Sequence, residues 1–221
     1  MMNPALIDSA KAFVKSRLEG AESGHDWFHI ERVWKMARVI RKMEKKGDIL
    51  IIELAALLHD IADPKFNDAY HDRSADTAYD FLIAEGLNRD KAAQVKAIIN
   101  HISFKGGIDP ARIDTIEFKI VQDADRLDAM GAIGIARAFN YGGFKNRPIH
   151  DPEIPLQNYR SSKEYHASAA PTINHFYEKL LRLKDLMNTD SGRKIASERH
   201  RYMEQFLQQF FREWNFQPRN D

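Results

Sequence analysis

The sequence predicts an all-α protein, with about eight helices marked by apolar residues that recur at helical spacing. The strict alternation of apolar and polar residues that is typical of strands is scarce. Signals for helix starts and stops separate the apolar segments, and a strong start signal is Asp109-Pro110, a capping carboxylate followed by a proline. With 221 residues, 43% of them hydrophobic, the chain can bury one sizeable core, and we expect a single domain over residues 1–221.

Five helices are expected in the first half of the chain, of which the first is amphipathic and the third is the most hydrophobic. The second begins at the capping box Ser23-Gly24-His25-Asp26. Gly86 closes the fourth as its C′ residue, and Asp90 can cap the fifth. The apolar positions that define these helices fall within residues 1–18, 23–43, 51–60, 75–82 and 90–102.

Three more helices and one irregular segment are expected in the second half. One helix follows Asp109-Pro110 and runs through Leu127, and two others, within residues 173–187 and 196–214, close the chain. Between them, the stretch from Asn140 to Lys163 is rich in glycine, proline, aromatic and charged residues, and we interpret it as a lid or binding loop. The expected layout is a core at about 20–140, this loop at about 140–163 and C-terminal helices at about 164–216.

Charge and composition limit the possible partners. Lysine and arginine total 33 against 32 for aspartate and glutamate, so neither a nucleic acid polymer nor a membrane surface is expected as a partner. The absence of cysteine excludes thiolate metal sites, and any metal must have nitrogen and oxygen ligands. No segment approaches the roughly 18 consecutive apolar residues that span a bilayer, and we expect a cytoplasmic location.

His25 and His29 are the first candidate site residues. If the helix begins at Ser23, their four-residue spacing places both imidazoles on one helix face, where one can bind a metal and the other a substrate. Taken alone, the pair is weak evidence and favours the simpler interpretation of one surface histidine and one histidine packed against Trp27 or Phe28.

His59 and Asp60 are more informative because they end the most hydrophobic helix of the chain. A buried carboxylate needs a partner, since desolvation otherwise raises its pKa and neutralises it. A divalent cation is a partner that a neighbouring imidazole can share. The alternative is a pair of local helix caps.

A third cluster of polar residues, Asp123, Asp125 and Asp128, lies in an otherwise apolar helix. On a helical wheel Asp123 and Asp125 are about 200° apart, so only one of them can face a given site. Asp123 lies nearer the face of Ile120 and Leu127, whereas Asp125 is on a second apolar face, and the wheel does not choose between them.

Together these motifs resemble the HD-domain superfamily of metal-dependent phosphohydrolases. The segments Gly-His-Asp-Trp-x-His-x-x-Arg-Val, Leu-His-Asp-Ile-Ala-Asp and Asp-Ala-Asp-Arg-Leu-Asp-Ala are similar to those of a bacterial subgroup of small stand-alone HD proteins. The resemblance implies an HD-domain-like helical bundle with additional C-terminal helices. It also implies that His29, His59, Asp60 and Asp125 hold the metal, that His25 faces the substrate and that Asp123 either supports the metal ligands or has a structural role.

Such a site implies metal-assisted hydrolysis of a phosphorylated small molecule. Mixed nitrogen and oxygen ligands suit Mn, Fe, Co, Ni or Zn, and Mg less well. Asp63 lies four residues after His59, where several HD phosphohydrolases have an acid that orients or deprotonates the attacking water. Pro64 follows it at once, so an Asp-Pro turn remains the alternative. Related guanosine-tetraphosphate hydrolases carry two successive acids at this place, which counts against that substrate.

Positive groups near the motifs are candidates for contacts with phosphate. They are Arg32, Lys65, His101 and Lys105. The resemblance favours a nucleotide substrate, with cleavage of a nucleoside triphosphate to monophosphate and pyrophosphate as the reaction. The alternatives are a nucleotide sensor or scaffold without turnover and, with lower weight, a di-iron oxygenase that uses additional histidines such as His71 and His101.

Overall fold

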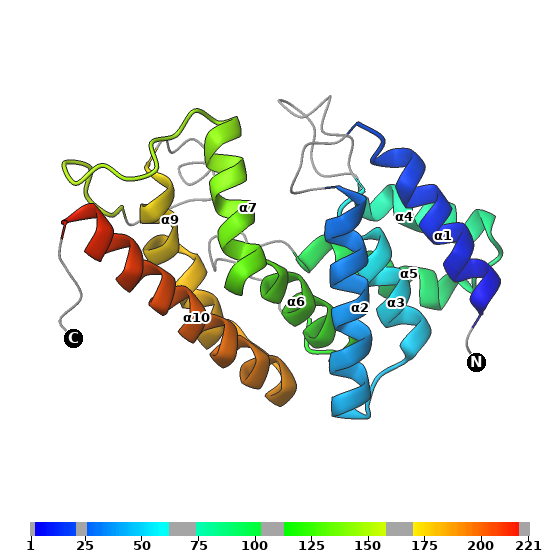
Figure 1. Cartoon of the computed structure of the whole chain (residues 1–221). Coiled ribbons are helices and arrows are strands. Elements are labelled where there is room, and N and C mark those ends of the chain that lie inside the picture. The colour runs from blue at the N-terminus through cyan, green and yellow to red at the C-terminus, as the bar shows by residue number, and fades with distance from the viewer. Residues whose placement is uncertain (1–2, 21–25, 62–73, 103–112, 158–169, 217–221) are drawn as a thin grey trace. The chain divides into compact units, whose positions relative to one another are not determined.

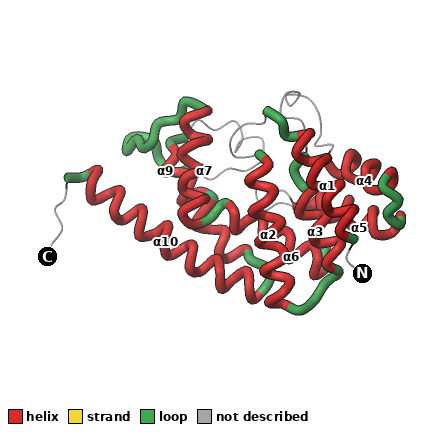
Figure 2. The backbone as a smooth tube through the Cα atoms, turned by 45° about the vertical axis from the view of Figure 1, so that its right-hand side comes forward, coloured by secondary structure: helices red, strands yellow, loops and turns green. Residues whose placement is uncertain are grey.

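The computed structural model describes residues 3–20, 26–61, 74–102, 113–157 and 170–216. Within these ranges the protein consists of helices and connecting loops and has no strand (Figure 2), so the all-α prediction is confirmed. The described residues divide into two compact units, one ending at Asp125 and one beginning at Arg126. Over the same ranges, no helix combines the length and the apolar character that crossing a bilayer requires.

The first unit is a bundle around a buried helix, α3 (Figure 1). Nine of the ten residues of α3 are buried, and the helix packs against its neighbours α1, α2, α4 and α5. Glu53 is a buried charge in the middle of α3. It pairs with Arg38 of α2, with 3.0 Å between Oε1 of Glu53 and Nε of Arg38. The helices of this unit are α1 (Pro4–Arg17), α2 (Trp27–Glu44), α3 (Ile49–Leu58), α4 (Ser74–Ala84), α5 (Arg89–Ile102) and most of α6 (Ile116–Asp128).

The start of α2 differs from the prediction. Asp26 has an extended backbone, with φ −89° and ψ 175°, and its carboxylate accepts a hydrogen bond of 3.0 Å from the backbone N–H of His29. Asp26 is therefore the N-cap, whereas a cap at Ser23 would require Asp26 to be helical. His25 lies outside the described residues, so the expectation that it shares a helix face with His29 stays a prediction.

Two other helix starts are also shifted from their predicted positions. Asn88, rather than Asp90, caps α5, because its side chain accepts hydrogen bonds from the backbone N–H groups of Asp90 and Lys91. At α6 the hydroxyl of Thr115 accepts a bond of 3.2 Å from the N–H of Phe118. Asp109-Pro110, the predicted start, lies outside the described residues. Each shift exchanges one good capping side chain for another nearby, a choice that local sequence leaves open.

The second unit packs around aromatic side chains. Phe176 is completely buried, and its ring centroid lies 5.8 Å from that of Phe206 and 6.0 Å from that of Phe139. Lys179, with φ −137° and ψ −61°, breaks the single helix expected over residues 173–187 into an α-helix and a 3-10 helix. The elements are α7 (Gly131–Phe144), α9 (Thr172–Glu178), the 3-10 helix η2 (Leu180–Leu186) and α10 (Asp190–Trp214).

The expected loop after Asn140 begins as helix, because α7 continues to Phe144. Gly142 permits close packing here: a Cβ atom at this position would lie 2.1 Å from Oγ1 of Thr172. Residues 145–157 form a loop that is tied to α9, where Asn174 donates a bond of 3.0 Å to the carbonyl oxygen of Ile154. The rest of the expected loop, residues 158–163, lies outside the described residues.

Candidate metal centre

Three of the four predicted metal ligands lie together in the first unit. His29 is in the first turn of α2, His59 caps the C-terminus of α3, and Asp125 is in the last turn of α6. Both histidines are buried, whereas the Asp125 side chain is 29% exposed. Three helices therefore each bring one side chain to a site whose carboxylate is partly exposed to solvent.

The ligand atoms of this group face one another. Nε2 of His59 lies 3.3 Å from Nε2 of His29, and Oδ1 of Asp125 lies 3.7 Å from Nε2 of His59 and 3.6 Å from Nε2 of His29. All three atoms are thus within 4.8 Å of one another. Two neutral ring nitrogens at this separation need a proton or a cation between them, since lone pairs repel. A divalent ion fits this donor set, because neutral imidazole and carboxylate are both common metal ligands.

The backbone fixes the tautomer of His59. Its Nδ1 lies 2.9 Å from the carbonyl oxygen of Ala56, one turn earlier in α3. A carbonyl oxygen can only accept, so Nδ1 carries the proton, and Nε2 of the neutral ring presents a lone pair to the site. This is the arrangement in which a histidine holds a metal.

The surrounding charges also favour a cation at this position. Burial lowers the pKa of His59, but the nearby carboxylate of Asp125 and the charge of Asp60 outweigh burial and raise the pKa overall. The site therefore stabilises positive charge between His59 and Asp125, as a bound divalent ion would require.

Asp60 and Asp123 are not members of the three-residue group. Asp60 is half-buried and acts on neighbouring His59 through its charge. Asp123 is completely buried, although it is only two residues from Asp125 in the same helix. Of the two aspartates that the helical wheel left open, Asp125 is thus the one beside the histidines.

The remaining predicted site residues are less closely placed. Arg32 is half-buried and lies three residues after His29 in α2. His101 is near the end of α5, and its Nδ1 lies 2.8 Å from the carbonyl oxygen of Ala97. Neither belongs to the group of His29, His59 and Asp125. The others, His25, Asp63, Lys65, Lys105 and His71, lie outside the described residues.

Sequence reasoning missed the contacts that hold the ligands in place. The Ala56 carbonyl that orients His59 has no sequence signal, because every residue carries one. Asp26 was expected inside α2, yet it caps the helix at the N–H of His29 itself. The pair of Glu53 and Arg38, which joins the two histidine-bearing helices, had one available signal: a charge in the middle of the most apolar helix.

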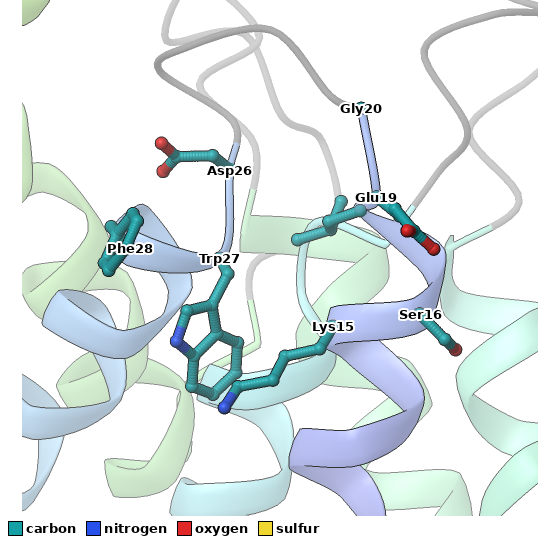
Figure 3. Close-up of a pocket in the computed structure, with 8 residues that line it drawn as sticks. Lys15, Ser16, Glu19, Gly20, Asp26, Trp27 and Phe28 are labelled. Carbon is teal, nitrogen blue, oxygen red and sulfur yellow. The ribbon is translucent and has the colours of Figure 1, made fainter.

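A pocket of about 560 Å³ lies where α1 ends and α2 begins (Figure 3). The ammonium of Lys15 lies over the indole of Trp27, 4.6 Å from the ring centroid, and the two side chains point toward each other in the figure. Acidic and basic groups both line this pocket, and none of the three grouped side chains does. Its lining residues are Lys15, Ser16, Leu18, Glu19, Gly20, Asp26, Trp27 and Phe28.

The fold and the site together define the class of protein. It is an α-helical bundle with a candidate metal centre, in which two histidines and an aspartate from three helices form one cluster. The protein-family model of the HD domain matches residues 27–130, a span that contains His29, His59 and Asp125. The chain belongs to the HD-domain superfamily, and the resemblance found in its sequence is confirmed.

Several bacterial proteins are similar over nearly the whole chain. YpgQ of Bacillus subtilis is 41% identical over 203 residues, which cover 91% of this chain and 90% of YpgQ. A crystal structure of YpgQ in complex with ADP matches with a TM-score of 0.71, covering 94% of each chain. An HD-superfamily hydrolase of Bacillus thuringiensis is 46% identical, with a TM-score of 0.75 and coverage of 97% of this chain and 99% of the other. A protein of Lactobacillus plantarum is 35% identical, with a TM-score of 0.84 and the same coverage.

Proposed function

We propose that this protein is a metal-dependent phosphohydrolase whose metal is held by His29, His59 and Asp125, with Asp60 as a fourth ligand. The observation that carries the proposal is the convergence of the two Nε2 atoms and Oδ1 within 4.8 Å. The resemblance implied Asp60 as a ligand, and its position next to His59 supports a role at the ion through charge or a rotated side chain.

A divalent ion held there supplies a Lewis acid for a phosphoryl oxygen and a bound water of lowered pKa. The residues of the chain do the rest. The Ala56 carbonyl keeps the donor nitrogen of His59 aimed at the ion. The partly exposed Asp125 leaves an approach for substrate, and Arg32 is the nearest predicted cation along α2 for a phosphate group.

A nucleotide is the proposed substrate class. The support is YpgQ, a relative at 41% identity over most of the chain, which was crystallised with ADP. The proposed reaction is cleavage of a nucleoside triphosphate to a monophosphate and pyrophosphate, with manganese among the candidate metals.

Release of phosphate and pyrophosphate from a panel of nucleotides, with Mn, Co, Ni, Zn, Fe or Mg added, tests this function. We expect pyrophosphate from at least one triphosphate, and loss of turnover and of bound metal in His59→Ala. Arg201→Ala, a change at an exposed position of α10, is the control that should keep both. Metal-loaded protein that releases neither phosphate nor pyrophosphate from any nucleotide would contradict the proposal.

A nucleotide-binding protein without turnover is the second candidate, and the ADP complex of YpgQ favours it as much as it favours an enzyme. Nucleotide-dependent stabilisation in a thermal-shift assay, without product from metal-loaded protein, would select this candidate. A di-iron oxygenase gains no support from the described residues, because the grouped ligands include only two histidines and His101 is not among them.

A further inference from the structure

The last turn of α6, residues 125–128, begins with a proposed ligand and ends in a turn held by charged side chains. Asp125 provides its carboxylate to the group with His29 and His59. Three residues later α6 ends at Asp128, and α7 begins at Gly131. The contacts that hold this turn join residues of the second unit, and α6 is continuous through its last turn.

Arg199 of α10 binds the end of α6 directly. Its guanidinium donates to the carbonyl oxygen of Leu127, which also accepts a bond of 3.0 Å from the backbone N–H of Met130. The carbonyls of a last helical turn have no partners within the helix, and this side chain adds a second donor to a carbonyl that the Met130 N–H already binds. Leu127 is completely buried, which makes the arginine contact more valuable.

Asp128 completes a charged cluster at the same turn. Its buried carboxylate accepts a bond of 2.7 Å from Nη1 of Arg137, in the second turn of α7. Burial lowers the pKa of the Arg199 guanidinium, and the charge of Asp128 opposes this effect. One buried carboxylate thus binds Arg137 and acts through its charge on Arg199 of another helix.

The aliphatic part of Arg199 also packs on the turn. Gly131 has a φ of +69°, and a Cβ atom there would lie 3.1 Å from Cγ and 3.2 Å from Cβ of Arg199. The glycine is needed for the backbone conformation and for the space that the arginine stem occupies. Arg199 therefore contacts the turn through its guanidinium and its methylene groups at once.

We propose that Arg199 is a positioning residue of the metal centre, which fixes the last turn of α6 and with it the carboxylate of Asp125. Helix ends fray, whereas metal–ligand distances tolerate only about 0.2 Å. A ligand in a last turn therefore requires an external clamp, which Arg199 provides together with Asp128 and Arg137. This inference rests on the proposed metal centre and does not depend on the substrate.

Metal binding by metal-free protein tests the inference without any activity assay. Titration with Co²⁺ and Mn²⁺ gives the affinity, and the visible absorption bands of bound Co²⁺ report its ligand geometry. We expect Arg199→Ala to weaken binding by about tenfold or more and to change the Co²⁺ spectrum, as losses of supporting contacts around metal ligands do. Arg199→Lys, which keeps the charge but not the planar fork, should fall in between. Arg201→Ala, two residues along the same helix at an exposed position, should bind as the wild type does.

The outcomes separate a positioning role from simple stabilisation. An arginine that only stabilises the fold would lower the unfolding temperature in Arg199→Ala and leave the affinity and the Co²⁺ spectrum of the folded protein unchanged, which would overturn the inference. If Arg199→Ala does not fold, Arg199→Lys and Asp128→Asn decide, and wild-type affinity and spectrum in both would overturn it equally. A wild-type protein that binds neither ion would overturn the metal centre itself and the inference with it.

Discussion

Asp123 and Asp125 are two residues apart in α6 and have different surroundings. Asp125 faces His29 and His59, whereas Asp123 is completely buried and is not part of their group. Asp125→Ala should therefore reduce metal affinity by at least about tenfold, with a smaller effect on the metal-free fold. Asp123→Ala should lower the free energy of unfolding by about 1–3 kcal/mol, because the polar groups around a buried carboxylate lose their partner.

Metal content by mass spectrometry and chemical denaturation of the metal-free variants measure the two effects. If the two effects are reversed, so that Asp123→Ala loses the metal and Asp125→Ala keeps it, the ligand assignment is displaced by two residues.

At the residue scale, a site residue can be predicted where a polar side chain occupies an otherwise apolar stretch of the sequence. The adjacent pair His59 and Asp60 at the end of an apolar helix is one example, and the acid-rich stretch that contains Asp125 is another. The wheel could not choose between Asp123 and Asp125, because both lie near apolar neighbours and only the packing of α6 decides which face meets the histidines.

At the scale of elements, the ion pair of Arg38 and Glu53 couples the two histidine-bearing helices, α2 and α3. The carboxylate is buried with only 7% of its side chain exposed, whereas the arginine side chain is 49% exposed and lies over the ring of Trp34. Arg38→Ala leaves a buried acid without its cation, and we expect a loss of about 1–3 kcal/mol in the free energy of unfolding.

Glu53→Leu should lower the free energy of unfolding less than Arg38→Ala does. The half-exposed arginine can turn to water, while leucine suits the apolar surroundings of α3. Urea denaturation of the two single variants and of the double variant measures this asymmetry. Equal losses in the two single variants would show that the pair itself, and not the buried charge, determines the stability.

Two adjacent glycines of α7 give a second test at this scale. Gly142 faces Oγ1 of Thr172 at a distance that leaves no room for a Cβ atom, while nothing lies within 4 Å of a Cβ placed on Gly143. Gly142→Ala should therefore lower the unfolding temperature, whereas Gly143→Ala should raise stability by up to about 1 kcal/mol through helix propensity. Destabilisation by Gly143→Ala as well would indicate that residues 142–143 are not helical, as the glycine-rich sequence had suggested.

At the scale of the whole molecule, periodicity predicted the all-α class and most helices of the first unit, because these helices bury one apolar face and α3 is buried nearly all round. Periodicity failed where a structural feature is not marked by the spacing of apolar residues. Glycines in α7 were interpreted as loop residues although Gly142 serves close packing, and the break at Lys179 has no proline or glycine to mark it. Caps were displaced because Asp, Asn, Ser and Thr compete for the same role within a few residues.

Acid should destabilise the second unit through His175 of α9. Burial, followed by the charges of Lys179 and Arg147, lowers the pKa of this imidazole to about 3. In the unfolded chain the same group titrates near its ordinary pKa of about 6.5, so between these values the unfolded state binds more protons. Stability is therefore unaffected by His175 above about pH 6.5 and falls as the pH drops toward 3, by at most about 1.4 kcal/mol per pH unit.

Unfolding of metal-free protein as a function of pH measures this dependence, and His175→Gln removes the titrating group. The variant should lose part of the wild-type slope between about pH 6 and pH 4 while the behaviour above pH 7 keeps its shape. Metal-free protein is essential, because protons also compete with a metal for His29 and His59 and would add a second acid-dependent loss. Identical slopes in the wild type and His175→Gln would place the acid sensitivity elsewhere, with the buried carboxylates of the first unit and the Asp128 cluster as the next groups to replace.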